Sequence, residues 1–259
     1  MVVLAVGCHP DDIELMMSGT LFLLGEAGCR LHYLTVASGD MGSMRLPRRR
    51  IAAVRRREAR NAAEYLGATY HESLTGDIEV FYSSRLIRRL AAVVRRVKPD
   101  LMLVQSLEDY MEDHMTSARL AVTAAFVRGM PNYRTAPPVA PVDGDMMIYH
   151  ALPHVLTDQM RRPIVPELFV DVSSVMDRKE RMLALHESQK SWLDETQGFD
   201  SYLAAMRGIA AEVGGRSGRF PYAEAWRRHS HVGFSRRDAN PLAELLGSRV
   251  AMHGGGGNP

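Results

Sequence analysis

Apolar runs alternate with stretches of helical periodicity along the first two thirds of this 259-residue chain. The short apolar runs predict strands at 2–6, 31–37, 69–74 and 101–105. The stretches between them predict helices at 13–27, 48–66, 84–97 and 114–127. This alternation favours a parallel sheet whose two faces are both covered by helices.

The last third of the chain is less regular. Four prolines within 131–141 predict a loop, and apolar runs predict later strands at 146–149 and 168–172. Helical stretches follow at 174–188 and 198–213. We therefore predict an α/β fold with a Rossmann-like, mostly parallel sheet flanked by helices and a less regular C-terminal third. A single domain is expected over 1–252, with a disordered tail at 253–259.

Composition excludes several classes of protein. The chain has 32 basic and 30 acidic residues, a net charge of +2 and two cysteines, which argues against a disulfide framework. No apolar run reaches the ~18 residues that span a bilayer. The N-terminus lacks a basic leader and a cleavage site, so a cytoplasmic location is expected. The arginines within 45–60 favour a solvated helix face over a nucleic-acid surface, because no stacking aromatics are interleaved.

A segment rich in side chains that can bind metal or transfer protons, Cys8 to Glu14, follows the first predicted strand and leads into the first predicted helix. Ligands of open α/β sheets bind at the carboxyl ends of strands, so this loop is well placed for a site. His9 and Asp12 are suited to bind one divalent ion, with Asp11 left free as a base. Nitrogen and carboxylate ligands suit Zn²⁺, with iron or cobalt as competitors. The alternative is a turn and helix cap made by the aspartates.

A second acidic segment, 108–114, follows the strand predicted at 101–105 and leads into a helix. It lies at the same edge of a parallel sheet as His9, so His114 is expected to complete a three-ligand set with one position open for water. Asp109 and Asp113 are placed to orient the ligands from behind. The alternative is an acidic helix N-terminus that complements the helix dipole, with His114 incidental.

Together the two segments resemble the signature of the LmbE-like (PIG-L) metal-dependent N-deacetylases. That signature pairs a first-strand His-Pro-Asp-Asp-x-Glu, here 9–14, with a downstream Asp-x-His-x-Asp-His, here 109–114. Further family-like stretches are Arg55 to Leu66-Gly67, Gly76-Asp77, Asp171 with Lys179, His186 to Gln189, and Tyr222 to Glu224. The resemblance covers about residues 2–226.

The resemblance implies hydrolysis of an N-acyl group, most often acetyl from an N-acetylglucosamine-type sugar or glycoside. It implies His9, Asp12 and His114 as metal ligands and Asp11 as general base. It assigns Arg55 and Asp77 to the sugar hydroxyls. A homo-oligomer is expected by analogy with similar proteins.

Met111 departs from the family pattern, which has a histidine there that is thought to donate to the tetrahedral intermediate. A methionine side chain cannot donate a hydrogen bond. His150, His154 and His231 are the candidate replacements, and the sequence does not rank them.

Three alternatives to a sugar deacetylase stay open. Met111 is also consistent with a catalytically weak or inactive sugar-binding homologue that keeps the fold and the metal. The second alternative is an amidase that cleaves a larger acyl conjugate, which belongs to the same class of reaction as the sugar deacetylase. A nucleotide-binding enzyme is disfavoured, because no Gly-x-Gly-x-x-Gly follows the first strand.

Overall fold

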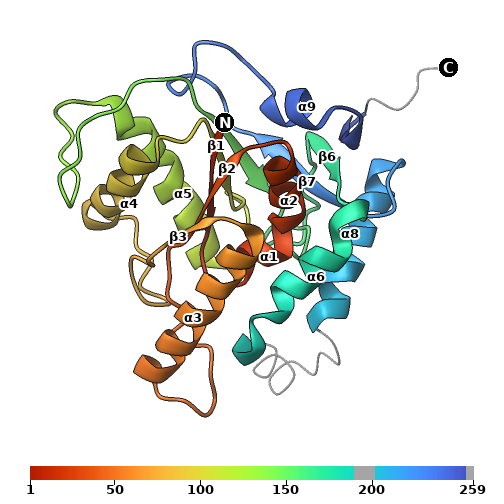
Figure 1. Ribbon diagram of the computed structural model, residues 1–259, viewed down its shortest axis with the longest axis horizontal. Coiled ribbons are helices and arrows are strands. Elements are labelled where there is room, and N and C mark those ends of the chain that lie inside the picture. Colours follow the sequence, from red (N-terminus) through yellow and green to blue (C-terminus); the bar gives the residue numbers. More distant parts are fainter. Residues whose placement is uncertain (190–201, 255–259) are drawn as a thin grey trace.

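Eight strands form one mixed sheet in the computed structural model, which describes residues 1–189 and 202–254 (Figure 1). The strands are β1 Val2–Gly7, β2 Arg30–Thr35, β3 Thr69–His71, β4 Leu101–Val104, β5 Met147–Ala151, β6 Leu168–Asp171, β7 Ala223–Arg228 and β8 Val250–Met252. The α-helices are α1 Asp12–Met16, α2 Ser18–Glu26, α3 Arg48–Leu66, α4 Ser84–Val97, α5 Glu112–Phe126, α6 Met176–Ala184, α8 Tyr202–Ser217 and α9 Pro241–Leu246. Most of the predicted tail, 255–259, lies outside the described residues.

The first five strands are parallel and run in the order β3-β2-β1-β4-β5. The chain winds outward from β1 in one direction to β3 and then returns to add β4 on the other side of β1. The boundary between β1 and β4 is therefore the topological switch point, where the loops after the two strands diverge and leave a crevice. The predicted α/β class and mostly parallel sheet are confirmed.

The remaining strands are antiparallel, and β7 lies between β5 and β6. The sequence predicted β5 and β6 but gave no strand at 223–228, where only a short motif was recognised. This strand forms because Glu224 and its neighbours pair with both β5 and β6, a partnership between segments more than 50 residues apart.

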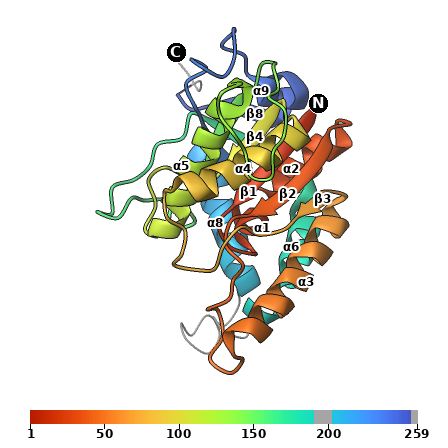
Figure 2. The ribbon, with the colours of Figure 1, turned by 90° about the vertical axis from the view of Figure 1, so that its left-hand side faces the viewer.

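Alternate side chains of the central strands enter two separate cores. Val3 and Ala5 of β1 pack on the face covered by α2, α3, α6 and α8, whereas Leu4 and Val6 pack under α4 and α5. Figures 1 and 2 show α4 and α5 on one side of the sheet and the other helices opposite them. This double cover explains why the parallel strands are apolar at nearly every position.

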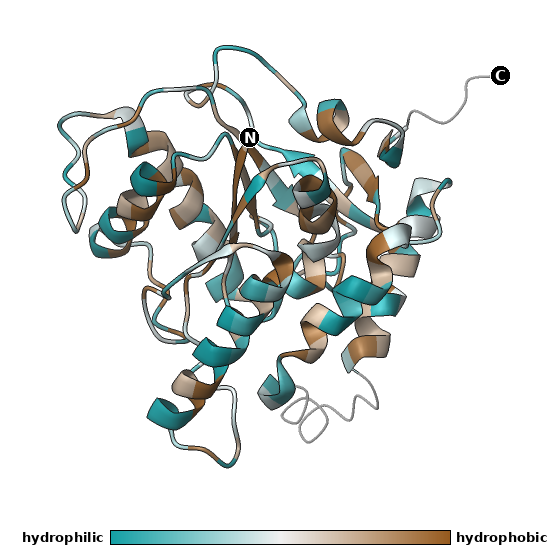
Figure 3. Cartoon of the chain, viewed as in Figure 1, coloured by the Kyte–Doolittle hydropathy of each residue, from teal (hydrophilic) through white to brown (hydrophobic). Residues whose placement is uncertain are grey.

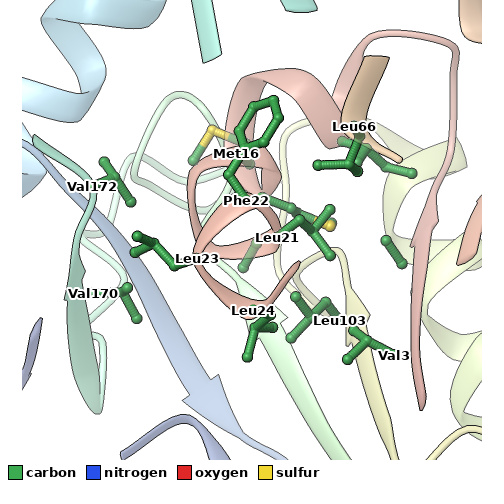
Figure 4. Packing of buried hydrophobic residues seen from close by; sticks show 14 of the residues in the cluster. Val3, Met16, Leu21, Phe22, Leu23, Leu24, Leu66, Leu103, Val170 and Val172 are labelled. Carbon is green, nitrogen blue, oxygen red and sulfur yellow. The ribbon is translucent and has the colours of Figure 1, made fainter. Parts of the chain in front are cut away.

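Helix α2 is buried from Ser18 to Leu24, and Figure 4 shows its apolar side chains enclosed between β1, β4, β6 and α3. Leu21 to Leu24 are each at most 2% exposed. By contrast, the outer face of α3 is hydrophilic (Figure 3), and Arg56 and Arg60 both form ion pairs with Glu72. These contacts agree with a solvated helix face.

The single helix predicted at 13–27 is broken at Met17, whose backbone leaves the helical region at φ −133°. The break leaves carbonyl groups at the end of α1 and amide groups at the start of α2 without helical partners. Lys179 Nζ donates to the carbonyls of Glu14 and Leu15, both at 2.8 Å. The Glu224 carboxylate accepts from the amides of Gly19 and Thr20 at 2.8 and 2.7 Å.

Lys179 and Glu224 also bind each other, with 2.6 Å between Nζ and Oε1, and their side chains are 1% and 3% exposed. Gly19 is required at this contact, since a Cβ there would lie 2.6 Å from Val172 and 2.9 Å from Glu224 Oε1. Two residues of the C-terminal third therefore stabilise the helices that follow the first strand.

None of the helices within 1–189 and 202–254 combines the length and the apolar character needed to cross a membrane.

Candidate active site

The loop after β1 is shaped by the Asp12 carboxylate. Asp12 Oδ2 accepts the backbone amides of Cys8 at 3.1 Å and His9 at 2.6 Å, which closes a tight turn. Asp11 has φ 112°, a left-handed conformation that costs a non-glycine residue about 1–3 kcal/mol and is concentrated at functional sites. The helix-cap alternative is met only in part, because the Asp11 side chain makes no capping bond.

Three side chains with metal-ligand atoms, His9, Asp12 and His114, meet at the switch point between β1 and β4. His9 Nδ1 lies 3.3 Å from His114 Nε2 and 3.6 Å from Asp12 Oδ2. His114 Nε2 lies 3.5 Å from Asp12 Oδ1. One atom from each of the three residues lies within 4.8 Å of the others, which is the spacing of a divalent-cation site.

The protonation of the two histidines tests whether this set fits a cation. Asp109 Oδ2 lies 3.1 Å from His114 Nδ1, and Asp113 Oδ2 lies 3.5 Å from His9 Nε2. With a proton on each of these outer nitrogens, each ring faces a carboxylate and keeps a lone pair on His9 Nδ1 or His114 Nε2. Those lone pairs then face each other and the Asp12 carboxylate, an arrangement of acceptors that a cation satisfies.

The pKa directions at this cluster follow its excess of carboxylate. Burial alone lowers the pKa of His114, but the charges of Asp12 and Asp109 outweigh it and raise that pKa above its usual value. Burial opposes ionisation of Asp12, but His114 and His9 hold its pKa well below the usual range. The carboxylates therefore favour positive charge at this point.

A second donor set, Cys8, His9 and Asp113, also has metal-ligand spacing. Burial raises the pKa of the Cys8 thiol to about 11, which disfavours the thiolate that binds metal. Cys8 does not line the cavity described below. The set with Asp12 and His114 is therefore the better candidate, and sequence reasoning did not anticipate the thiol.

The Asp11 carboxylate contacts two further side chains that line the cavity, Arg55 and Tyr202. Arg55 Nη2 lies 3.3 Å from Asp11 Oδ1 and also donates to the carbonyl of Pro10 at 2.5 Å. The hydroxyl of Tyr202 donates to Asp11 Oδ2 at 2.5 Å. Burial and the neighbouring Asp12 charge raise the pKa of Asp11, and Arg55 opposes the rise. The Tyr202 contact was missed, because Tyr202 lies in α8 outside the recognised motifs and reaches Asp11 only through the tertiary fold.

A cavity of about 360 Å³ opens in front of the three donors, and it is also lined by Asp11, Arg55 and Asp77. The Asp77 carboxylate accepts the amides of Gly39 at 2.7 Å and Met41 at 2.9 Å, so it holds the 39–42 loop against the site. The Arg55 guanidinium lies under this loop, where a Cβ at Gly39 or Gly42 would fall 2.6 Å from it.

Of the three candidate histidines, His154 lines the cavity, and His150 and His231 do not. The His154 ring packs edge-on against Tyr110 with centroids 4.9 Å apart, and burial lowers its pKa. His150 is buried elsewhere, with Nδ1 2.8 Å from the Gln105 carbonyl oxygen. Met111 also lines the cavity, as the residue before α5.

The sequence of this chain matches a known protein family and several known proteins. The family model described as GlcNAc-PI de-N-acetylase, PIG-L, matches residues 4–125. A diacetylchitobiose deacetylase of Thermococcus kodakarensis is 30% identical over 231 residues, which cover 87% of this chain and 82% of the relative.

Hydratases match this chain at a similar sequence identity. A 4-oxalmesaconate hydratase of Pseudomonas putida is 30% identical over 232 residues, covering 85% of this chain and 86% of the relative. The crystal structure of a 4-carboxy-2-hydroxymuconate hydratase from Pseudomonas putida matches with a TM-score of 0.74 and 25% identity, over 92% of this chain and 98% of that one.

Proposed function

The chain belongs to the PIG-L (LmbE-like) family, and from this premise we propose that it is a metal-dependent hydrolase that removes the acetyl group from an N-acetylglucosamine-type sugar. The observation that carries the proposal is the convergence of His9, Asp12 and His114 ligand atoms within 4.8 Å of one another, with the buried Asp11 carboxylate lining the same cavity. Zn²⁺ is the proposed ion, with Fe²⁺ or Co²⁺ as competitors. A homo-oligomer and a cytoplasmic location stay predictions.

In the proposed reaction His9, Asp12 and His114 hold the cation, and Asp109 and Asp113 orient the two histidines. A bound divalent cation supplies Lewis acidity for the acyl oxygen and for water.

The proton transfers are assigned to Asp11. Asp11 accepts the proton of the attacking water and returns it to the amine nitrogen as the C–N bond breaks, so the products are acetate and a free amine. Arg55 and Tyr202 hold the Asp11 carboxylate in place.

The charge that develops on the acyl oxygen needs a donor, which Met111 cannot provide. We assign this role to His154, because it lines the cavity and its lowered pKa keeps the ring neutral, with one N–H to donate. Arg55 and Asp77 are proposed to contact the sugar hydroxyls, in addition to the loop contacts that they make.

A hydratase is the second candidate, because a curated relative and a solved structure, both from Pseudomonas putida, are named as hydratases. Its substrate, by its name, bears carboxylates, which need cationic partners. Among the described residues that line the cavity, Arg55 is the only lysine or arginine, and Asp11, Asp12 and Asp77 oppose it. A bound divalent cation would bring this lining to about zero net charge, which leaves no surplus of positive charge for a polycarboxylate and favours a neutral sugar amide.

The test measures acetate release from N-acetylglucosamine and N,N'-diacetylchitobiose by protein stripped with a chelator and then reloaded with Zn²⁺, Fe²⁺ or Co²⁺. Release that is lost with the chelator and restored by a metal is expected. In parallel, the absorbance of unsaturated carboxylic acids reports addition of water. A metal-loaded, folded protein that hydrates such acids and releases no acetate contradicts the proposal. A protein that binds the sugars without either reaction supports the inactive, sugar-binding alternative.

A further inference from the structure

We propose that the cavity contains an apolar subsite, formed by Leu15 of α1 and by Ala205 and Ile209 of α8, that binds an aliphatic acyl chain longer than acetyl. The inference rests on the proposed amide hydrolysis and names the substrate class within it, an amino sugar that carries a medium-chain acyl group.

The first support is the pattern of side chains on α8. Met206, Ala210 and Val213 are buried at helical spacing and anchor the helix in the core. Ala205 and Ile209 are four residues apart on a neighbouring stripe, are partly exposed, and line the cavity. The helix therefore presents apolar side chains to the site beside the stripe that anchors it, and Ile209 contacts both the cavity and the core.

The second support is that polar side chains gather at one end of the cavity, where Met41 and Ile78 also line it. Arg55, Asp77 and Gln189 gather around the 39–42 loop, where Gly42 approaches both Arg55 and Gln189. This end suits sugar hydroxyls.

The apolar residues make a different set of contacts. Leu15 and His154 also line the small hollow beside Leu152, and Ile209 packs on the cluster that contains Leu152 and Leu156. The apolar end of the cavity therefore lies toward the chain that follows β5, away from the 39–42 loop.

The proposed centre sets the direction of the substrate. The amide carbon has to lie at His9, Asp12 and His114, with the sugar on the Arg55 side. The group attached beyond the acyl carbon then extends toward Leu15 and Ile209. A volume of about 360 Å³ is within the ~300–1,000 Å³ of pockets that enclose drug-sized ligands.

The test uses metal-loaded protein and glucosamines acylated with acetyl, butyryl, hexanoyl and octanoyl groups, with release of glucosamine as the assay. Each methylene that becomes fully buried is worth about fourfold in kcat/KM, so we expect hexanoyl to exceed acetyl by at least about tenfold. A medium-chain alkyl glycoside that keeps the N-acetyl group tests the other end of the substrate, and no such gain is expected there.

Ala205→Leu fills the proposed subsite and is expected to lower the ratio of hexanoyl to acetyl kcat/KM by about tenfold or more. Ala211→Leu is the matched control, because Ala211 is exposed on the same helix and does not line the cavity. It is expected to leave the ratio unchanged. A ratio that both variants lower equally points to a general effect on α8 and contradicts the subsite.

Binding of the product acids gives a readout that is independent of turnover. Calorimetry on the metal-loaded protein is expected to show tighter binding of hexanoate than of acetate, and Ala205→Leu is expected to remove the difference. Acetyl cleavage with no gain from longer chains, together with equal affinity for the two acids, overturns the subsite and leaves deacetylation intact. Chain-length-dependent binding without cleavage of any amide keeps the subsite and rejects the proposed reaction.

Discussion

The buried pair of Lys179 and Glu224 supplies a prediction whose size can be worked out from its contacts. Lys179 Nζ uses all three of its donors, on the Glu14 and Leu15 carbonyls and on Glu224 Oε1. Lys179→Met removes these bonds and leaves the Glu224 carboxylate buried without a counter-charge. Breaking a buried pair in this way costs about 3–5 kcal/mol. That is a large part of the ~5–15 kcal/mol that stabilises a typical domain.

Thermal and urea unfolding measure this loss. At about 2–4 °C per kcal/mol for a domain of this size, Lys179→Met is expected to lower Tm by roughly 6–20 °C. Arg178→Met is the matched control, since Arg178 is the adjacent residue and its ion pair with Glu26 is largely exposed. Such a pair is worth about 0–1 kcal/mol after screening by solvent, and the Arg178 guanidinium also lies 4.2 Å from the centroid of the Phe22 ring, a contact worth about 0.5–1 kcal/mol. The control is therefore expected to lower Tm by about 1–8 °C, less than Lys179→Met.

The double variant Lys179→Met, Glu224→Gln separates the pair from its surroundings. It removes both charges, so it is expected to cost less than the sum of the single changes by at least about 1 kcal/mol. Single changes that add without coupling would refute the assignment of this stability to the pair.

The remaining predictions concern the site. Asp11→Asn is expected to lower kcat by about 10²–10⁴-fold with metal stoichiometry unchanged, measured by acetate release and metal analysis; a wild-type rate removes Asp11 from the base role. Asp109→Asn is expected to weaken metal affinity by about 10–100-fold in competition with a chelator, since it removes the negative charge that lies 3.1 Å from His114 Nδ1. Met111→His is expected to raise kcat if the oxyanion lacks a second donor; no change leaves that role to His154 alone.

The sequence predicted those parts of the molecule that local pattern determines. The bounds of α3 and α4 agree with prediction because local sequence signals, Gly67 after the first helix and Pro99 after the second, mark where each helix ends. The two donor loops were placed together correctly, since both follow parallel strands of one sheet.

The features that were missed depend on distant partners. The break at Met17 follows from contacts with Lys179 and Glu224, more than 150 residues along the chain. Tyr202 reaches Asp11 across 191 positions and has no local signature. The periodicity of a single segment cannot predict the helix break or the Tyr202 contact, because both depend on interactions that form only when the C-terminal third packs against the first helices.

Lys179 also provides a reporter of how the molecule opens. The chain has three lysines, Lys98, Lys179 and Lys190, and Lys98 is exposed. An amine-reactive reagent reaches Lys179 only when α6 and β7 separate from the first two helices. Its labelling rate under native conditions therefore measures how often that separation occurs. A metal that binds only the closed form slows the labelling in proportion to its occupancy, so a single amine records both metal binding and the motion that it restrains.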